Sequence, residues 1–289
     1  MAISAAEVKK LRDQTGAGMM DCKSALEEAN GNFEEANTLL RKKGLASAAK
    51  KAGRTTSDGL IGFAVSADHS TGTLVEVACE TDFVANTDDF KQLIQNVLAE
   101  IEKAGDAANA AWLADANGPI HPLVAAAIGK LGENMAVPRF VRYAGQGYVG
   151  QYIHMGGKLG VQVEFSGVTP EVAAKDEFAT LVKEVAMQIA AAGPLYATRA
   201  EVPADALEKE KSIYRAQMES SGKPANVIEK IVDGKLGSYY AQVVLIDQAS
   251  IRDPKQTVAD VIAAANKALG ASIGVTRFAR LKVGETVAA

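Results

Sequence analysis

The chain has 289 residues, of which 48% are hydrophobic and 23% are charged, so it is long enough for two globular domains and a small additional module. Its formal net charge is -4 and its isoelectric point is about 5.6, which excludes the overall positive field that draws proteins to nucleic acid or an anionic membrane. No apolar run approaches membrane-spanning length and the N-terminus lacks the apolar core of a secretory signal, which predicts a cytoplasmic protein with a protein partner.

Three short helices are predicted over residues 1–44. Ser4 and Glu7 form the pattern of a capping box, because the serine side chain accepts from the third backbone amide while the glutamate reaches back to the cap. The second helix is predicted from about Met19 to Ala29 and ends at Asn30-Gly31, residues that tolerate the left-handed conformation. Asn32 caps the third helix. The apolar stripe of this third helix consists of Phe33, Ala36, Leu39 and Leu40.

The predicted three-helix unit is small and must have a thin core. It is therefore predicted to be a docking module rather than a catalytic domain. The stretch ASAAKKAGRTTSDG (46–59) follows as a predicted linker, and the first domain with its linker is placed at residues 1–54. The two cysteines, Cys22 and Cys79, lie outside any CxxC spacing, so we expect buried or half-buried free thiols.

An internal duplication follows the linker. GLIG (59–62) resembles GYVG (147–150), and VPRFVR (137–142) resembles VTRFAR (275–280). Each half opens on a predicted hairpin and closes on a strand, with helical segments such as residues 88–103 between them. The sequence therefore predicts an α+β fold, in which helices pack on two small antiparallel sheets, with domains at residues 55–143 and 144–289.

The second half contains about 50 additional residues, because Gly62 to Val137 covers 75 positions and Gly150 to Val275 covers 125. Residues of about 200–246 are predicted to form two helices that are broken at Gly222-Lys223-Pro224. The facing residues are predicted to be Leu207, Tyr214 and Met218 on one helix and Ile228, Ile231 and Tyr239 on the other. A projecting coiled-coil hairpin and two ordinary core helices fit this pattern equally well.

Several short motifs suggest chemistry but stand in the wrong context. GQGYVG (145–150) fits the dinucleotide fingerprint, yet a strand is predicted after it, where the fingerprint requires a helix. GASIG (270–274) fits the nucleophile elbow, but the order of strand and helix is reversed and no histidine follows Ser272. His69, His121 and His154 lack metal-ligand spacing. No assembled active site is predicted.

Two longer stretches indicate a protein family far more specifically than these short motifs do. LRDQTGAGMMDCKSAL (11–26) and EVACETDFVAN (76–86) closely resemble the signature stretches of the bacterial elongation factor Ts family. LGEN (131–134), HMGGKLGV (154–161) and the turn SGKP (221–224) resemble further segments of that family in the same order. The chain departs from the family pattern at Ala78, usually asparagine, at Asn86, usually lysine or arginine, and at Pro138, which breaks a usually basic pair.

The resemblance implies a guanine-nucleotide exchange factor for elongation factor Tu, with a three-helix module similar to ubiquitin-associated domains. It implies that Phe83 wedges between two helices of the partner's G domain, that Asp82 disturbs the groups that position Mg²⁺, and that the core spans the G domain and the third domain. The implied contact residues are Met19, Met20, Thr81, Asp82, Phe83, Val84, Leu131, Gly132, Glu133, Asn134, His154, Gly156 and Gly157. It implies no cofactor or metal of the chain's own, because Mg²⁺ and GDP or GTP are bound by the partner.

The stretch ETDFVAN (80–86) is predicted to be neither strand nor helix, and its phenylalanine has two interpretations. Phe83 in an arbitrary sequence would be an ordinary core aromatic under a strand end, whereas the family resemblance predicts an exposed contact. Two other functions stay open: an adaptor that binds the GTPase without affecting nucleotide release, and an enzyme that uses one of the glycine motifs. A one-to-one heterodimer and a two-plus-two complex, without direct nucleic acid or membrane contact, are both compatible with the sequence.

Overall fold

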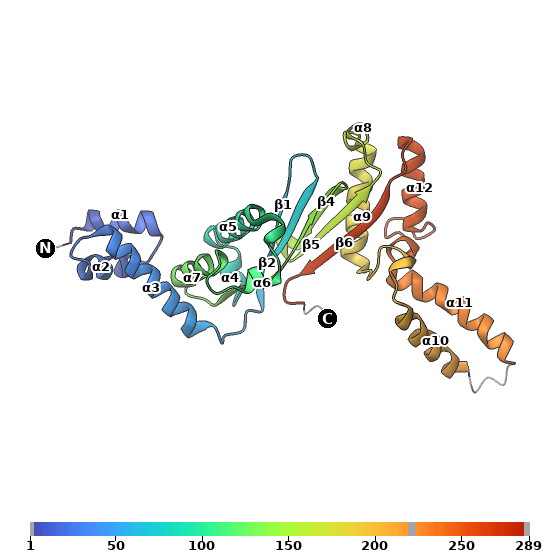
Figure 1. The fold of residues 1–289 in the computed structure, drawn as a ribbon, viewed down its shortest axis with the longest axis horizontal. Helices are drawn as coiled ribbons and strands as arrows, with labels where there is room; N and C mark the ends of the chain where they lie inside the picture. The colour runs from blue at the N-terminus through green and yellow to red at the C-terminus, as the bar shows by residue number, and fades with distance from the viewer. Residues whose placement is uncertain (1–2, 219–223, 286–289) are drawn as a thin grey trace.

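The computed structural model describes residues 3–218 and 224–285, and it begins with a module of three helices (Figure 1). These are α1 (Ala5–Thr15), α2 (Met19–Glu28) and α3 (Phe33–Lys51). The predicted capping box of Ser4 is present, Asn32 caps α3, and Asn30 has a positive φ of 51°. Both cysteines are free and buried, as predicted.

The predicted linker is wrong at its start, because residues 46–51 continue α3. Alanine and lysine, which dominate this stretch, have high helix propensity. The same part of α3 packs on α7 (Ile120–Leu131) of the core. A Cβ atom on Gly44 would lie 3.3 Å from the carbonyl oxygen of Ala125, so the glycine permits this close helix crossing.

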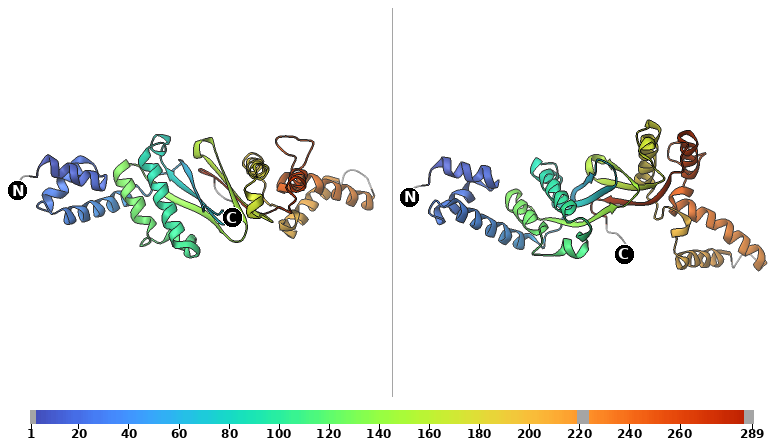
Figure 2. Two further views of the ribbon diagram at one scale, coloured as in Figure 1. Left: turned by 90° about the horizontal axis from the view of Figure 1, so that it is seen from above. Right: turned by 45° about the horizontal axis from the view of Figure 1, so that its top comes forward.

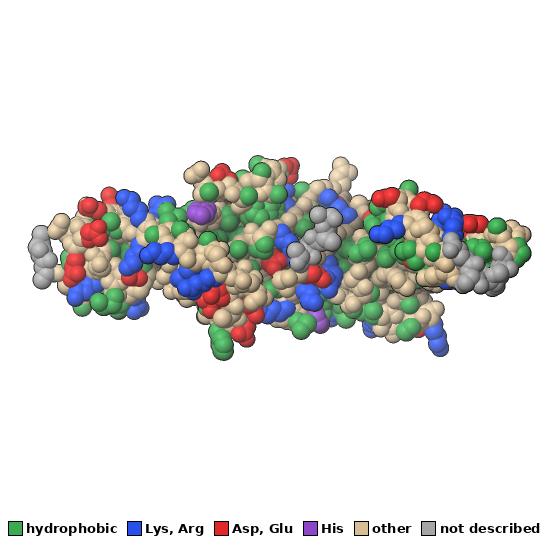
Figure 3. All heavy atoms as spheres, turned by 90° about the horizontal axis from the view of Figure 1, so that it is seen from below, with side chains coloured by type: hydrophobic (Ala, Val, Ile, Leu, Met, Phe, Trp, Pro, Cys, Tyr) green, Lys and Arg blue, Asp and Glu red, His purple; other side chains and the backbone are tan. Residues whose placement is uncertain are grey.

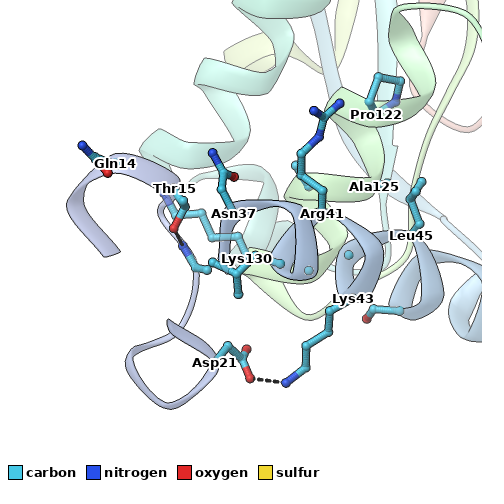
Figure 4. Close-up of a pocket in the computed structure, with 16 residues that line it drawn as sticks. Gln14, Thr15, Asp21, Asn37, Arg41, Lys43, Leu45, Pro122, Ala125 and Lys130 are labelled. Atoms are coloured by element: carbon cyan, nitrogen blue, oxygen red, sulfur yellow. Dashed lines mark hydrogen bonds and ion pairs between the residues drawn. The ribbon is translucent and has the colours of Figure 1, made fainter. Parts of the chain in front are cut away.

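A cleft of about 320 Å³ marks the seam between the module and α7 (Figure 4). Lys43 of α3 forms an ion pair with Asp21 of α2 at its edge, at 2.5 Å. Lys130 of α7 extends over Gly16, the left-handed residue that ends α1, and forms an ion pair with Asp89 at 2.6 Å. The N-terminal module is therefore packed against the core in this structure.

The core consists of two three-stranded antiparallel sheets with helices on their outer faces, which confirms the predicted α+β class (Figures 1 and 2). The first sheet has the order β1-β2-β3, and the second has the order β4-β5-β6. The first half contains β1 (Asp58–Val65), β2 (Thr71–Cys79), α4 (Asp82–Ala85), α5 (Asp88–Ala104), α6 (Ala110–Ala114), α7 and β3 (Met135–Ala144). The second contains β4 (Tyr148–His154), β5 (Leu159–Ser166), α8 (Pro170–Ala173), α9 (Asp176–Ala192), α10 (Ala204–Met218), α11 (Ala225–Val243), α12 (Val258–Leu269) and β6 (Gly274–Lys282).

The duplication is more complete in the structure than in the sequence. A shift of 88 positions relates α4 to α8, which have 4 residues each, and α5 to α9, which have 17 each. A shift of 138 positions relates α7 to α12, which have 12 residues each, and β3 to β6. A Cβ atom on Gly62 would lie 2.1 Å from Ile94 of α5, and one on Gly150 would lie 2.4 Å from Val182 of α9. Both halves thus use glycine to bring a helix close to the sheet.

The additional residues of the second half form a helical hairpin that projects from the core (Figures 1 and 2). Within α10 and α11 only Val232 and Leu236 are buried, which distinguishes them from core helices. Arg215 of α10 donates to both carboxylate oxygens of Glu229 of α11, at 2.8 and 3.0 Å. Of the predicted break between the helices, Pro224 precedes α11, and Gly222 and Lys223 lie outside the described residues.

Candidate partner-binding site

The stretch after β2 forms a single helical turn, α4, where the sequence predicted neither strand nor helix. Thr81 adopts an extended conformation and its Oγ1 accepts a hydrogen bond from the backbone N–H of Val84 at 3.4 Å, which caps the turn. Ala85 lies on the buried side of α4 and Phe83 on the other, with 82% of the phenylalanine exposed. The interpretation of Phe83 as an ordinary core aromatic is therefore wrong.

The second half of the chain provides a comparison for this turn. Thr169 caps α8 by accepting from the N–H of Val172 at 3.3 Å, as Thr81 does in α4. Glu171 occupies the position of Phe83 and is exposed. The same local structure thus forms with a charged, well-hydrated side chain at this position. Folding of the turn does not require an aromatic residue, and the exposed ring of Phe83 needs another explanation.

The segment after α7 holds the α4 turn in place. Glu133 accepts two hydrogen bonds from Thr81, one from the backbone N–H at 3.0 Å and one from Oγ1 at 2.6 Å. The backbone N–H of Asn134 donates to Glu80 at 2.6 Å, and its side-chain amide donates to the carbonyl oxygen of Arg54 at 2.7 Å. The turn of residues 81–84 is thus joined to Glu133 and Asn134 through the hydrogen bonds of Thr81 and of the preceding Glu80.

The tip of the β4–β5 hairpin lies at the same end of the first sheet. Asp58 opposes Cys79 in the register of β1 and β2, and Lys158 forms an ion pair with Asp58 and donates to the carbonyl oxygen of Gly59 at 2.9 Å. His154 is exposed, and one ring nitrogen lies 2.9 Å from the hydroxyl of Tyr152. Gly157 packs on Leu60, whereas Gly156 has open space around it.

The remaining implied contact residues occupy different positions. Met19 and Met20 begin α2 in the N-terminal module and are 46% and 73% exposed. No hydrogen bond or ion pair among the described residues joins α2 to α4. Leu131 packs partly into the core of the first half, and Gly132 ends α7 with a φ of 81°. The implied contact residues therefore lie on several separate parts of the structure rather than in one pocket.

The thiol of Cys79 lies beside the turn and is not activated. Burial, followed by the carboxylates of Glu133 and Asp58, raises the pKa of Cys79 to about 12, so this thiol is a poor nucleophile. Its Sγ donates to the carbonyl oxygen of Thr81 at 3.1 Å. Within the described ranges, no group of three or more histidine, cysteine, aspartate or glutamate residues could hold a metal ion.

The elements around GQGYVG and GASIG do not match those of a dinucleotide-binding motif or a nucleophile elbow. β4 begins at Tyr148, within GQGYVG, so a strand follows the first glycines instead of a phosphate-binding helix. GASIG lies after α12 and before β6, which is the reverse of a nucleophile elbow. A Cβ atom on Gly147 would lie 2.5 Å from the side chain of Glu164, so this glycine permits close packing.

Three residues that support the site, Arg54, Asp58 and Glu80, were not predicted from the sequence. Arg54 lies in the predicted linker, and its guanidinium is 3.4 Å from Glu80. Glu80 lies within the signature stretch 76–86, but nothing in the local pattern indicated Asn134 as its hydrogen-bond partner. The one available signal for Asp58 was Lys158 in the segment HMGGKLGV, a cation that needs an acidic neighbour when half-buried.

The surface of the molecule carries charges of both signs. On the face in Figure 3, acidic and basic side chains are interspersed with apolar ones, without an extended basic patch. In the part of the chain that the structure describes, no helix combines the length and apolar character needed to cross a membrane.

Comparison with known proteins agrees with this architecture. The family model described as Elongation factor TS matches residues 80–285, from the turn that carries Phe83 to just beyond β6. The chain is 45% identical to the elongation factor Ts of Trichlorobacter lovleyi, over 99% of this chain and 94% of that protein. It is 46% identical to the protein of that name from Nitratiruptor sp., over 99% and 95%, and 42% identical to that of Aquifex aeolicus, over 98% and 99%.

Similarity at this level over nearly the full length defines the class of the protein, a translation elongation factor. The chain belongs to the elongation factor Ts family. The resemblance of the signature stretches to this family is thereby confirmed.

Proposed function

We propose that the chain is a guanine-nucleotide exchange factor that binds elongation factor Tu in its GDP form and promotes release of GDP. The observation that carries the proposal is the exposed ring of Phe83 on a turn whose duplicate forms with Glu171 at the same position. An aromatic side chain that is unnecessary for folding and faces solvent is suited to insertion into another protein.

In this proposal Phe83 enters between two helices of the G domain, and Asp82 disturbs the groups that position Mg²⁺. A GTPase holds its nucleotide largely through phosphate contacts and Mg²⁺, so displacing the helices that support the metal weakens nucleotide binding without contact with the base. The factor carries out no bond-making chemistry of its own. It requires no cofactor or metal, because Mg²⁺ and the nucleotide belong to the partner.

Binding of the factor and binding of the nucleotide to the GTPase are thermodynamically linked. Any free energy by which the factor lowers nucleotide affinity equals the free energy by which nucleotide lowers the affinity of the factor. Binding of GTP, which follows GDP release, therefore favours dissociation of the factor and completes the cycle.

Contacts at several surfaces add to the effect of Phe83 and supply the rest of the coupling between binding of the factor and release of the nucleotide. Met19 and Met20 of α2 dock on the G domain. The segment of residues 131–134 and His154 face its phosphate side and neighbouring surfaces, and the core spans the G domain and the third domain. Linked sites of this kind raise the overall affinity beyond that of any one contact. The complex is a heterodimer or a two-plus-two assembly in the cytoplasm, without direct contact with nucleic acid or membrane.

The test is release of a fluorescent GDP analogue from elongation factor Tu, chased with excess unlabelled GDP. We expect substoichiometric amounts of the chain to accelerate release, because each molecule dissociates and acts again. Co-elution with elongation factor Tu on a sizing column without any change in the release rate would instead support the adaptor function.

A further inference from the structure

Glu133 is placed to control the geometry of the α4 turn. Its two carboxylate oxygens accept separately from the N–H and the hydroxyl of Thr81, at 3.0 and 2.6 Å. These two residues are 52 positions apart in sequence, so the pairing fixes the turn to the end of α7. A carboxylate that accepts two hydrogen bonds holds its partner in both position and orientation.

This contact is absent from the duplicate half. Gly132-Glu133-Asn134 after α7 corresponds to Gly270-Ala271-Ser272 after α12, and both glycines end their helix in the left-handed conformation. Ala271 therefore occupies the position of Glu133 and has no carboxylate to offer Thr169. The α8 turn nevertheless forms with its threonine cap. Because the α8 turn forms without a carboxylate, formation of such a turn does not require the clamp between Glu133 and Thr81. The clamp occurs in the half that carries the exposed aromatic ring, where it fixes the turn relative to the end of α7.

We infer that Glu133 is a positioning residue for nucleotide exchange: it presets the α4 turn so that Phe83 is presented to the GTPase in its binding orientation. The inference rests on the proposed function. A turn that is ordered before binding avoids the entropy cost of ordering on the partner. Fixing the backbone of one residue corresponds to roughly a 5- to 30-fold change in an equilibrium constant.

Asn134 connects the clamp to the N-terminal module. Its side-chain amide donates to the carbonyl oxygen of Arg54 at 2.7 Å, and its backbone N–H donates to Glu80 at 2.6 Å. Arg54 lies between α3 and β1, so the same two-residue segment holds both the α4 turn and the connection to the docking module. The α4 turn is therefore joined through Glu133 and Asn134 to the chain segment that leads to the docking module.

Direct contact of Glu133 with the GTPase is the alternative implied by the family resemblance. Both carboxylate oxygens are already engaged with Thr81, and the side chain is half-buried. If Glu133 acts through Phe83, replacing both residues should cost no more exchange activity than replacing Phe83 alone. If Glu133 touches the partner, the two losses should add. A double-mutant cycle separates the two possibilities.

The first experiment uses the free protein and is independent of exchange activity. In a Trp112→Phe background, which removes the single native tryptophan, Phe83→Trp places an indole on α4. We expect Glu133→Ala to lower the steady-state fluorescence anisotropy of this indole, and the conservative Thr81→Ser to leave it unchanged. Equal anisotropy with and without Glu133, in variants with matched melting temperatures, would overturn the inference.

The second experiment measures GDP release from elongation factor Tu as a function of factor concentration. We expect Glu133→Ala to lower exchange efficiency about 5- to 30-fold and to have little further effect when Phe83→Ala is already present. Thr81→Val should lower efficiency more than its matched control Thr169→Val, which removes a cap but no clamp. Additive effects of Glu133→Ala and Phe83→Ala would overturn the inference and assign Glu133 a direct contact.

The two experiments distinguish the inference from the function on which it rests. Loss of anisotropy in Glu133→Ala supports the clamp even if elongation factor Tu does not respond to the protein. Normal exchange by Phe83→Ala would reject the function proposed for the ring and leave the anisotropy result to decide whether Glu133 orders the turn.

Discussion

Replacement of Phe83 by alanine is the most direct test of the function. The ring is 82% exposed in the free chain, and complete burial of a phenylalanine side chain is worth about 1.5–3 kcal/mol. Burial of the exposed fraction on the partner therefore contributes about 1.2–2.5 kcal/mol. At about 1.4 kcal/mol per decade, this corresponds to roughly an 8- to 60-fold loss of exchange efficiency.

The assay is GDP release from elongation factor Tu over a range of factor concentrations, with wild type and variant measured side by side. Phe63→Ala is the matched control, since Phe63 is also an exposed phenylalanine, at 48%, but lies on β1 outside the turn. Phe83→Glu copies the residue found in the duplicate turn and should lower exchange at least as strongly. Both substitutions at position 83 should change the free energy of unfolding by less than about 0.5 kcal/mol, because the ring packs little in the free chain.

Two results would refute the reasoning. Exchange by Phe83→Ala within twofold of wild type would show that the ring is not inserted at a step that affects release. A fall of several kcal/mol in the free energy of unfolding of Phe83→Ala would show that the ring is structural. Any loss of exchange would then follow from loss of folded protein.

Three further predictions concern the scaffold. Gly62→Ala should lower the free energy of unfolding in urea by about 1–3 kcal/mol, because its Cβ would overlap a side chain of α5, whereas Gly234→Ala, with open space around it on α11, should raise it by about 0.5–1 kcal/mol. Arg139→Met should cost about 3–5 kcal/mol, because it leaves the buried carboxylate of Glu76 without its cation, and a change below 1 kcal/mol in urea unfolding would contradict this. Because the folded-state pKa of Cys79 is raised from 9.0 to about 12, the thiol's contribution to stability is complete below pH 9 and falls as pH rises from 9 to 12; urea unfolding should show a steeper loss over this window in wild type than in Cys79→Ala.

The local features of the chain followed from short stretches of sequence. The capping box at Ser4, the cap at Asn32 and the hairpins each depend on hydrogen bonds and side-chain alternation within a few residues. GQGYVG was rejected on the order of strand and helix around it, and GASIG on that order and on the lack of a histidine after Ser272. The end of α3 was not predicted, although alanine and lysine favour a helix locally; packing on α7, which lies far along the chain, adds to this preference.

The sequence by itself determined the α+β class, the duplication and the signature stretches, because residue periodicity and turn chemistry are properties of neighbouring residues. Only the tertiary structure decided that Phe83 faces solvent, since burial depends on which elements cover a position. It also decided that Glu133 holds Thr81 and that Ala271 leaves the duplicate turn without a clamp. Such pairings form when antiparallel strands bring distant chain segments to one end of a sheet, and no local pattern in the chain encodes that distance.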